Sequence, residues 1–273
     1  RRSRVIVMST SLKVSRVTLY ALILGLSAKE KKSNIAGWFV TGMQIALRIS
    51  IYSGMYRVAL GSNNSQFVNG IWAIAFSQLI WGGERPQLSL QIGREIKDGT
   101  LSMYLLRPAS YINQAAFSYI GRSIPDHSSI AVFGFTTAFL LTGEVPFSLV
   151  AVPFIFLLVC VGILLVVTIE VVLGLTGFWT TDTSGVQLMN HKLSLLFGGI
   201  IIPFALLPET IADIVRYTPW TIAIAGPGNV ATHFEYLLYL QVITVALCWC
   251  AFFYLIAMRL YNKGIKKLNI GGG

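Results

Sequence analysis

The chain has 273 residues, of which 55% are hydrophobic and only 12% are charged, and its mean hydropathy is +0.69. Soluble domains carry about 25% charged residues, so this composition excludes a fully water-exposed protein and indicates an integral membrane protein. The formal net charge of +10 does not indicate a nucleic acid partner, because the Lys and Arg residues lie between apolar runs rather than on one folded face. We expect membrane lipid to surround most of the chain.

The N-terminal stretch, residues 1–34, is basic and only partly apolar. Within it, Val5–Ser27 mixes Lys13 and Arg16 with Val, Leu, Ile and Tyr, which is typical of a helix that lies in the membrane interface. We predict an interfacial elbow helix on the cytoplasmic side. A disordered tail is the alternative.

Residues 35–261 form the predicted transmembrane domain, and residues 262–273 a cytoplasmic tail. A spanning helix needs about 20 mostly apolar residues, because every backbone amide must be paired inside the membrane. The sequence therefore predicts an all-α integral membrane protein with six transmembrane helices, of which the second, third and fifth are short. The predicted spans are Ile35–Leu60, Phe67–Trp81, Ile130–Leu141, Phe147–Trp179, Leu193–Leu207 and Phe234–Leu260.

The positions of Lys and Arg predict the orientation. Of the 21 Lys and Arg residues, 18 lie in the N-terminal stretch, in the segment 85–123, at Lys192 or after residue 258, and short loops rich in these residues stay in the cytoplasm. We therefore predict a multi-pass protein of the cell (inner) membrane with both termini in the cytoplasm.

Arg48 is unusual because it falls near the middle of the first predicted span, where an unpaired charge costs about 2.5 to 3.5 kcal/mol. Gln44 and Tyr52 share its helical face by their spacing of four, and they form a polar stripe that would line a path for an anionic or amphipathic substrate. A structural ion pair or a snorkelling side chain is the alternative. Glu170, in the fourth predicted span, is a candidate counter-ion.

The cytoplasmic segment 85–123 is the most informative part of the sequence. Ile92–Ser123 reads IGREIKDGTLSMYLLRPASYINQAAFSYIGRS, in which charged residues stand beside large apolar ones, so part of it can bury an apolar face while its charges meet water or a protein. Gly99 permits a turn and Pro108 stops a helix. These features predict a docking loop.

Two motifs resemble a known family. The run Glu95-x-x-x-Gly99-Thr100-Leu101, followed by Leu105, Leu106 and Pro108, resembles the signature after the second span in permease subunits of type 2 ABC exporters, in particular the short six-span branch with a GxLxxYLLxP loop. The second motif is GFWTTDTSGVQ at Gly177–Gln187, followed by GGIIIPFALLPETIADIVRYTPW at Gly198–Trp220. The family has a comparable Gly, Pro and Leu-Pro pattern in and after its fifth span.

The resemblance implies an architecture and a set of partners. The fifth span would be short and followed by re-entrant helices, which suits the four prolines between Pro203 and Pro227 because non-helical backbone in a membrane must be buried in protein or line water. Two permease chains, identical or paralogous, would form the pathway of an exporter, and two separate ABC ATPase subunits would bind ATP and Mg. This chain would be non-catalytic and hold no cofactor.

The resemblance, together with the polar stripe at Arg48, gives two sets of expected site residues. Those expected to couple the chain to the ATPase are Arg94, Glu95, Lys97, Asp98, Gly99, Leu101, Tyr104, Leu105 and Pro108, although solvated charges are the alternative for any one of the charged members. The expected translocation path comprises Gln44, Arg48, Tyr52, Glu170, Phe197 and Phe204.

Enzyme motifs are absent from the sequence. It contains no Gly-x-Ser-x-Gly, no His-Glu-x-x-His and no Gly-Lys dipeptide, which a nucleotide-binding Walker A loop requires. The three cysteines lie in apolar runs, where neither a disulfide nor a metal site is expected.

A stand-alone secondary transporter or channel is the alternative function. Such a protein would be expected to have an inverted repeat or carboxylates near the membrane midplane, and Glu170 is the only acidic residue deep in a predicted span.

Overall fold

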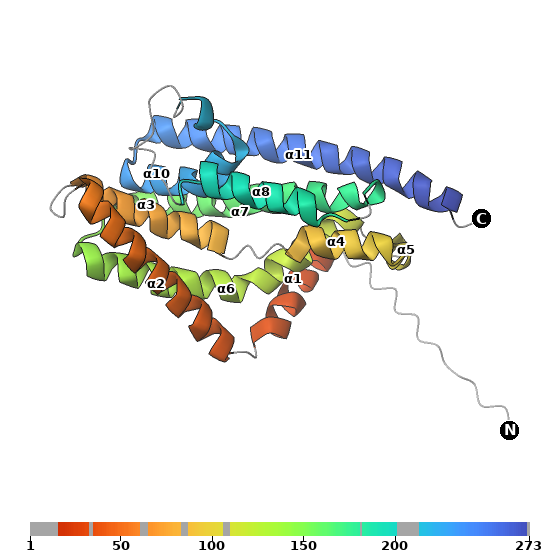
Figure 1. Cartoon of the computed structure of the whole chain (residues 1–273), viewed down its shortest axis with the longest axis horizontal. Helices are drawn as coiled ribbons and strands as arrows, with labels where there is room; N and C mark the ends of the chain where they lie inside the picture. The colour runs from red at the N-terminus through yellow and green to blue at the C-terminus, as the bar shows by residue number, and fades with distance from the viewer. Residues whose placement is uncertain are drawn as a thin grey trace.

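A computed structural model of the chain describes residues 16–32, 35–60, 65–82, 87–105, 110–180, 182–200 and 213–271, and their regular structure is helical throughout (Figure 1). The longer helices are α1 (Arg16–Lys32), α2 (Ile35–Leu60), α3 (Ser65–Gly82), α4 (Gln87–Lys97), α6 (Tyr111–Thr142), α7 (Val152–Leu175), α8 (Ser184–Phe197) and α11 (Tyr236–Gly271). Shorter elements are α5 (Leu101–Leu105), α10 (Gly226–Thr232), the 3₁₀ turns η1 (Leu149–Ala151) and η2 (Thr176–Phe178), and the π-helix η4 (Thr221–Ala225).

Three of the described helices are long and apolar enough to cross a bilayer: Ile35–Val58, Leu149–Phe178 and Tyr236–Lys267. They coincide with the first, fourth and sixth predicted spans. The structure therefore confirms an all-α protein of membrane type, whereas the total of six spans stays a prediction.

The second and third predicted spans lie in α3 and α6, which are not among those three helices. Phe67–Trp81 falls inside α3, which buries Ser77 and Gln78 among its apolar residues because it packs against α2, α6 and α10. Ile130–Leu141 is the last part of α6, which ends at Gly143 with a left-handed φ of 76°. Other helices of the bundle cover much of the surface of these two segments.

The helices form a bundle with two distinct ends (Figure 1). Helices α4 and α5 and the C-terminal end of α11 lie together at one end, which we call the α4 end. Helix α10 and the N-terminal end of α11 lie at the other, which we call the α10 end. The segment 85–123, predicted as one loop, contains α4, α5 and the first turns of α6, so most of its described part is helical.

After the fifth predicted span the chain returns to the bundle in two short helices. The element η4 and helix α10 are buried against α3, α7 and α11. The contact is close because a Cβ on Gly162 would lie 2.6 Å from the Ala223 carbonyl oxygen. That these two helices re-enter the membrane stays a prediction, and Pro203 and Pro208 lie outside the described residues. The fifth predicted span, Leu193–Leu207, overlaps helix α8 only in its first five residues, because α8 runs from Ser184 to Phe197.

Helix α11 has 36 residues, which at about 1.5 Å per residue exceeds the roughly 30 Å of a bilayer's hydrocarbon core. Its last turns extend to the α4 end (Figure 1). There Gly264 packs on the Phe178 ring, and the Lys267 ammonium donates a hydrogen bond of 3.2 Å to the Phe178 carbonyl.

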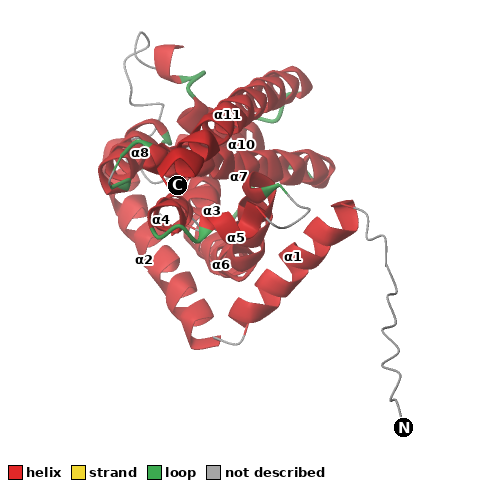
Figure 2. Cartoon of the chain, turned by 90° about the vertical axis from the view of Figure 1, so that its right-hand side faces the viewer, coloured by secondary structure: helices red, strands yellow, loops and turns green. Residues whose placement is uncertain are grey.

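The described part of the predicted elbow is helix α1, which packs along the first half of α6. Tyr20 stacks on Phe117 at 5.1 Å, and the Ser27 and Ser118 hydroxyls lie 3.1 Å apart. Helices α1 and α2 form a V on the outside of the bundle (Figure 2). The membrane-interface location of α1 stays a prediction, and its predicted beginning at Val5 lies outside the described residues.

Gly121 sets how closely α1 approaches α6, because a Cβ there would collide with the Leu24 carbonyl oxygen of α1. We expect Gly121→Ala to loosen α1, at a cost of about 1 to 3 kcal/mol for overpacking, and to make α1 more sensitive to limited proteolysis. Gly25→Ala is the matched control, since nothing lies within 4 Å of its Cβ position, and it should strengthen α1 by about 0.5 to 1 kcal/mol. Equal protease sensitivity of the two variants would contradict this account.

Candidate functional site

Helix α4 is amphipathic, with one face inside the bundle and one outside. Leu88, Ile92 and Ile96 are buried, whereas Arg94 and Lys97 are exposed. Apolar residues spaced by four lie on one helical face, so the sequence itself fixes which side is buried. At the α4 end, which faces the viewer in Figure 2, the exposed Arg94 and Lys97 give the helix a charged, accessible face.

A glycine turn joins α4 to α5. Gly99 has a φ of 70°, and its amide donates to the Ile96 carbonyl at 3.3 Å. Only glycine adopts this φ without strain. The turn leaves Asp98 exposed and returns Leu101 to the interior, where it is fully buried.

The remaining predicted coupling residues lie beyond this turn. The Tyr104 ring contacts the Tyr111 ring edge-on at 5.4 Å. The side chain of Leu105 and all of Pro108 lie outside the described residues.

Glu95 is engaged inside the chain. Its carboxylate accepts hydrogen bonds from the Tyr111 hydroxyl at 2.6 Å and from the Gln91 amide at 2.7 Å. The Arg122 guanidinium donates a hydrogen bond of 2.8 Å to the side-chain carbonyl oxygen of Gln91. This network ties α4 to α6 and leaves Arg94, Lys97 and Asp98 as the exposed charges of the predicted coupling set.

Three glycine contacts seat α4 against the turn between α7 and α8. A Cβ on Gly174 would lie 2.6 Å from the Ile92 Cβ, and one on Gly177 would lie 3.2 Å from the Gly93 Cα. A Cβ on Gly93 would lie 2.6 Å from the Thr183 hydroxyl. These contacts leave no room for a side chain between the two backbones, so α4 cannot shift without moving η2.

The first residues of α8 are held by Asp182. Its carboxylate accepts hydrogen bonds from the Ser184 hydroxyl at 2.5 Å and the Ser184 amide at 2.9 Å. These bonds, with a smaller contribution from the Lys97 charge, hold the pKa of Asp182 below its usual value. Asp182 therefore stays ionised at the α4 end.

Glu170 accepts hydrogen bonds from the N-terminal turn of α4. The Ser89 amide donates to one carboxylate oxygen at 3.3 Å, and the Asn190 side chain donates to the other at 3.0 Å. The first amides of a helix have no partner within it and carry the positive end of its dipole, so a carboxylate placed here stabilises α4 and fixes its direction.

The contacts of Glu170 continue into a buried chain of polar groups. The Ser89 hydroxyl donates to Gln187 at 2.8 Å, and the Trp220 indole donates to Asn190 at 2.8 Å. The hydroxyl of Thr221, which follows Trp220, donates to the Phe197 carbonyl at 2.7 Å. We call Ser89, Glu170, Gln187, Asn190 and Trp220 the buried relay, because they connect α4 through α7 and α8 to η4.

The predicted path residues on α2 face outward. Gln44 and Arg48 are exposed and Tyr52 is partly buried. The Arg48 guanidinium lies over the Trp81 ring at 5.8 Å. Trp81 lies in the last turn of α3. Arg48 therefore lies beside the C-terminal end of α3 rather than beside its middle.

Glu170, the candidate counter-ion of Arg48, does not pair with it in the part of the chain that the structure describes. Within the described residues, no ion pair joins the two, and Glu170 is buried against α4 and α8. Of the other two predicted path residues, Phe197 lies beside Trp220, with 6.2 Å between the two ring centroids. Phe204 lies outside the described residues. The predicted path residues are therefore spread over two separate places.

A comparison with protein-family models identifies the class of protein. Residues 84–272 match the model described as an ABC-2 family transporter protein. The match covers more than half of the chain, and it includes α4, α5 and the buried relay but not the predicted path residues on α2. The chain belongs to the ABC-2 family of transporter proteins, whose members are the membrane components of ABC transporters. A search of curated proteins found no match.

Sequence reasoning missed the buried relay. Ser89, Gln187 and Asn190 are ordinary polar residues, and their partners are 20 to 98 residues away in the chain. The sequence carries one signal, because the motif at Gly177–Gln187 resembles the family although the resemblance gives it no role. The structure gives it one: this segment forms the seat of α4.

Proposed function

We propose that the chain is the permease subunit of an ATP-driven exporter, and that separate ATPase subunits move it by binding at α4 and α5. Six transmembrane helices and cytoplasmic termini belong to this proposal. The alternative is a stand-alone secondary transporter or channel.

The observation that carries the proposal is the seat of α4. A helix that a motor protein pushes must be accessible on one face and fixed to the transmembrane helices on the other. The exposed Arg94 and Lys97 meet the first requirement, and the glycine contacts with η2 meet the second. Force applied to α4 would be transmitted through the buried relay to η4.

A second permease chain is part of the proposal because of the outer face of α2. Gln44 and Arg48 stand exposed among apolar neighbours such as Leu47 and Ile51. A charged side chain facing lipid is unfavourable, whereas the same residue facing a partner chain or a water-filled path is paired or hydrated. We therefore place the translocation path along α2, between two permease chains.

The proposal predicts the effect of charge reversal on ATPase binding. The double variant Arg94→Glu with Lys97→Glu should reduce ATPase subunits recovered with the affinity-purified chain by about tenfold or more, because reversed charges at an interface repel the partner's complementary groups. The measurement is the molar ratio of ATPase to permease after purification in detergent.

Arg216→Glu is the matched control, since Arg216 is an exposed cation near the α10 end and its reversal should leave the ratio unchanged. Recovery of the unaltered chain with no ATPase and no second permease chain would favour the stand-alone transporter or channel instead.

A further inference from the structure

A cavity of approximately 680 Å³ opens at the α10 end, between α3, η4, α10 and the first turns of α11. Its volume lies in the range of small-molecule sites, about 300 to 1,000 Å³. None of the predicted path residues that the structure describes lines it. It is therefore a separate feature that the proposed coupling mechanism does not explain.

Two polar side chains in the cavity wall have unused hydrogen-bonding capacity. Ser77 is 2% exposed, and within the described residues its hydroxyl has no hydrogen-bond partner. The Asn229 side-chain amide likewise has no partner in the part of the chain that the structure describes. Buried polar groups are normally hydrogen-bonded, so an unpaired hydroxyl facing a cavity indicates that the cavity is occupied by a polar group or water.

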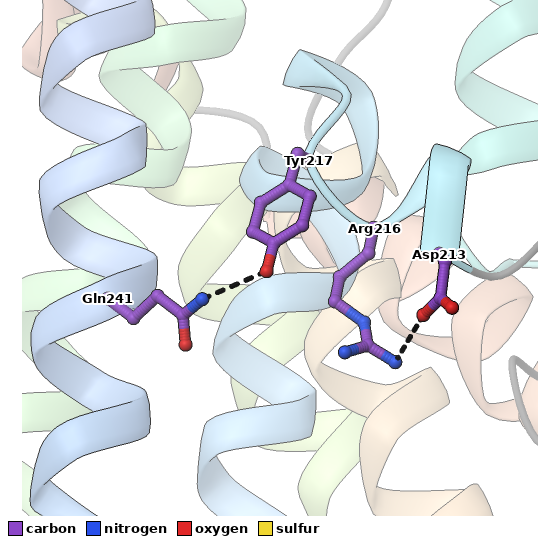
Figure 3. Close-up of polar contacts among 4 residues, drawn as sticks. All are labelled: Asp213, Arg216, Tyr217 and Gln241. Carbon is purple, nitrogen blue, oxygen red and sulfur yellow. Dashed lines mark hydrogen bonds and ion pairs between the residues drawn. The ribbon is translucent and has the colours of Figure 1, made fainter.

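The rim adds further donors and acceptors. The Gln241 amide nitrogen donates to the Tyr217 hydroxyl at 3.0 Å, which leaves the Gln241 carbonyl oxygen free to accept (Figure 3). The Asn69 side-chain nitrogen and the His233 Nε2 atom, which belong to two further lining residues, lie 3.4 Å apart. Amide groups supply both a donor and an acceptor.

The cavity is close to electrically neutral. No carboxylate is among its described lining residues. Its one guanidinium, Arg216, is paired with Asp213 at 3.2 Å just outside (Figure 3). An anionic ligand would find its cation already paired and would face amide carbonyls, and a cationic ligand would find no counter-charge.

Hydroxyl groups match this lining best, because each of them can both donate and accept. Part of the wall is apolar, formed by Leu238, Val242 and Val245 of α11. A saccharide has this same combination, with hydroxyls around its edge and C–H groups on its ring faces.

We propose that this cavity binds a neutral polyhydroxylated group, the saccharide part of a cargo molecule, at the extracytoplasmic side. The proposal rests on the proposed exporter function for its orientation. Thr221 and Ile222 of η4 line the cavity directly after Trp220 of the buried relay. Movement of α4 would thus reach the wall of the cavity and change its affinity for the group.

The test is protection of a cysteine by a neutral saccharide. Thr232→Cys is introduced after replacement of Cys160, Cys248 and Cys250 by Ala; Thr232 lines the cavity, but its hydroxyl is already bonded to the Gly228 carbonyl at 3.1 Å. Right-side-out membrane vesicles are treated with a membrane-impermeant maleimide, with and without maltotriose. We expect labelling from outside that slows by about threefold when maltotriose reaches twice its dissociation constant.

Two controls accompany the test. Leu149→Cys, 90% exposed in η1 and outside the cavity wall, should react at the same rate with and without maltotriose. Asn229→Leu, added to the Thr232→Cys chain, should abolish the protection while the unprotected labelling rate stays the same.

The possible failures are distinguishable. No protection by maltotriose at saturating millimolar concentrations, or protection by inorganic phosphate that equals or exceeds that by maltotriose, overturns the saccharide site and leaves the exporter function intact. Reaction of both cysteines only in inside-out vesicles overturns the orientation, and the proposed function with it.

Discussion

Replacing Glu170 by Ala is expected to destabilise the chain by about 2 to 4 kcal/mol and to release α4 from the bundle. The change leaves the Ser89 amide and the Asn190 side chain without the acceptor that each has now, and each unsatisfied buried donor costs about 1 to 3 kcal/mol. The measurements are the apparent unfolding temperature of the purified chain and its recovery of ATPase subunits.

Glu170→Gln is the matched comparison. Glutamine has the same shape and keeps one acceptor oxygen, so it can satisfy one of the two donors but not both. We expect a loss of stability about half as large as that of Glu170→Ala. If both variants unfold at the temperature of the unaltered chain, Glu170 does not hold α4 and the buried relay is not a structural unit.

Gly174→Leu should have an effect of similar size for a steric reason. Even a Cβ at this position would lie 2.6 Å from the Ile92 Cβ and 3.0 Å from the Ser89 carbonyl oxygen. The larger side chain must push α4 away from α7, with an overpacking cost of about 1 to 3 kcal/mol. We expect a lower unfolding temperature, together with ATPase recovery reduced by about tenfold.

The control for this variant is Gly185→Leu. Gly185 lies in the first turn of α8, and nothing lies within 4 Å of its Cβ position. The substitution should leave stability unchanged or raise it slightly, since leucine favours helix over glycine by up to about 1 kcal/mol. Equal effects of the two variants would show that close contact at Gly174 is not what seats α4.

The spans that hydropathy predicts directly are those whose apolar composition is explained by contact with lipid alone. The segment Leu149–Phe178 has an uninterrupted apolar run, and hydropathy identifies it directly. Helix α3 is harder to predict, because it carries Ser77 and Gln78 inside the bundle. Neighbouring helices shield these residues, and a sequence window contains no information about neighbours.

The coupling residues show a similar division. The spacing of Ile92 and Ile96 places α4 in the wall of the bundle, and the neighbouring charges predict its exposed face. The engagement of Glu95 by Tyr111 could not be predicted, because it depends on how α6 turns back beside α4. A charge in a motif can therefore bind another protein or hold its own helix, and the sequence alone does not decide between the two.

Arg48 illustrates how position along a helix can mislead. It is near the centre of α2, yet it contacts Trp81 at the α4 end of α3. Helix α2 is longer than α3 and crosses the bundle obliquely (Figure 1), so the midpoint of α2 is not at the midpoint of α3. The polar stripe of Gln44 and Arg48 consequently lies closer to the α4 end than its place in the sequence suggested.

The uninterrupted length of α11 gives the molecule a lever arm. One end of this helix is fastened to Phe178 beside the seat of α4, and the other supplies Gln241 and Val242 to the cavity wall. A rigid rod of 36 residues, about 54 Å long, that tilts by about 5° displaces its far end by about 5 Å. Under the proposed exporter function, a small movement at the seat of α4 would therefore become a larger movement of the cavity wall.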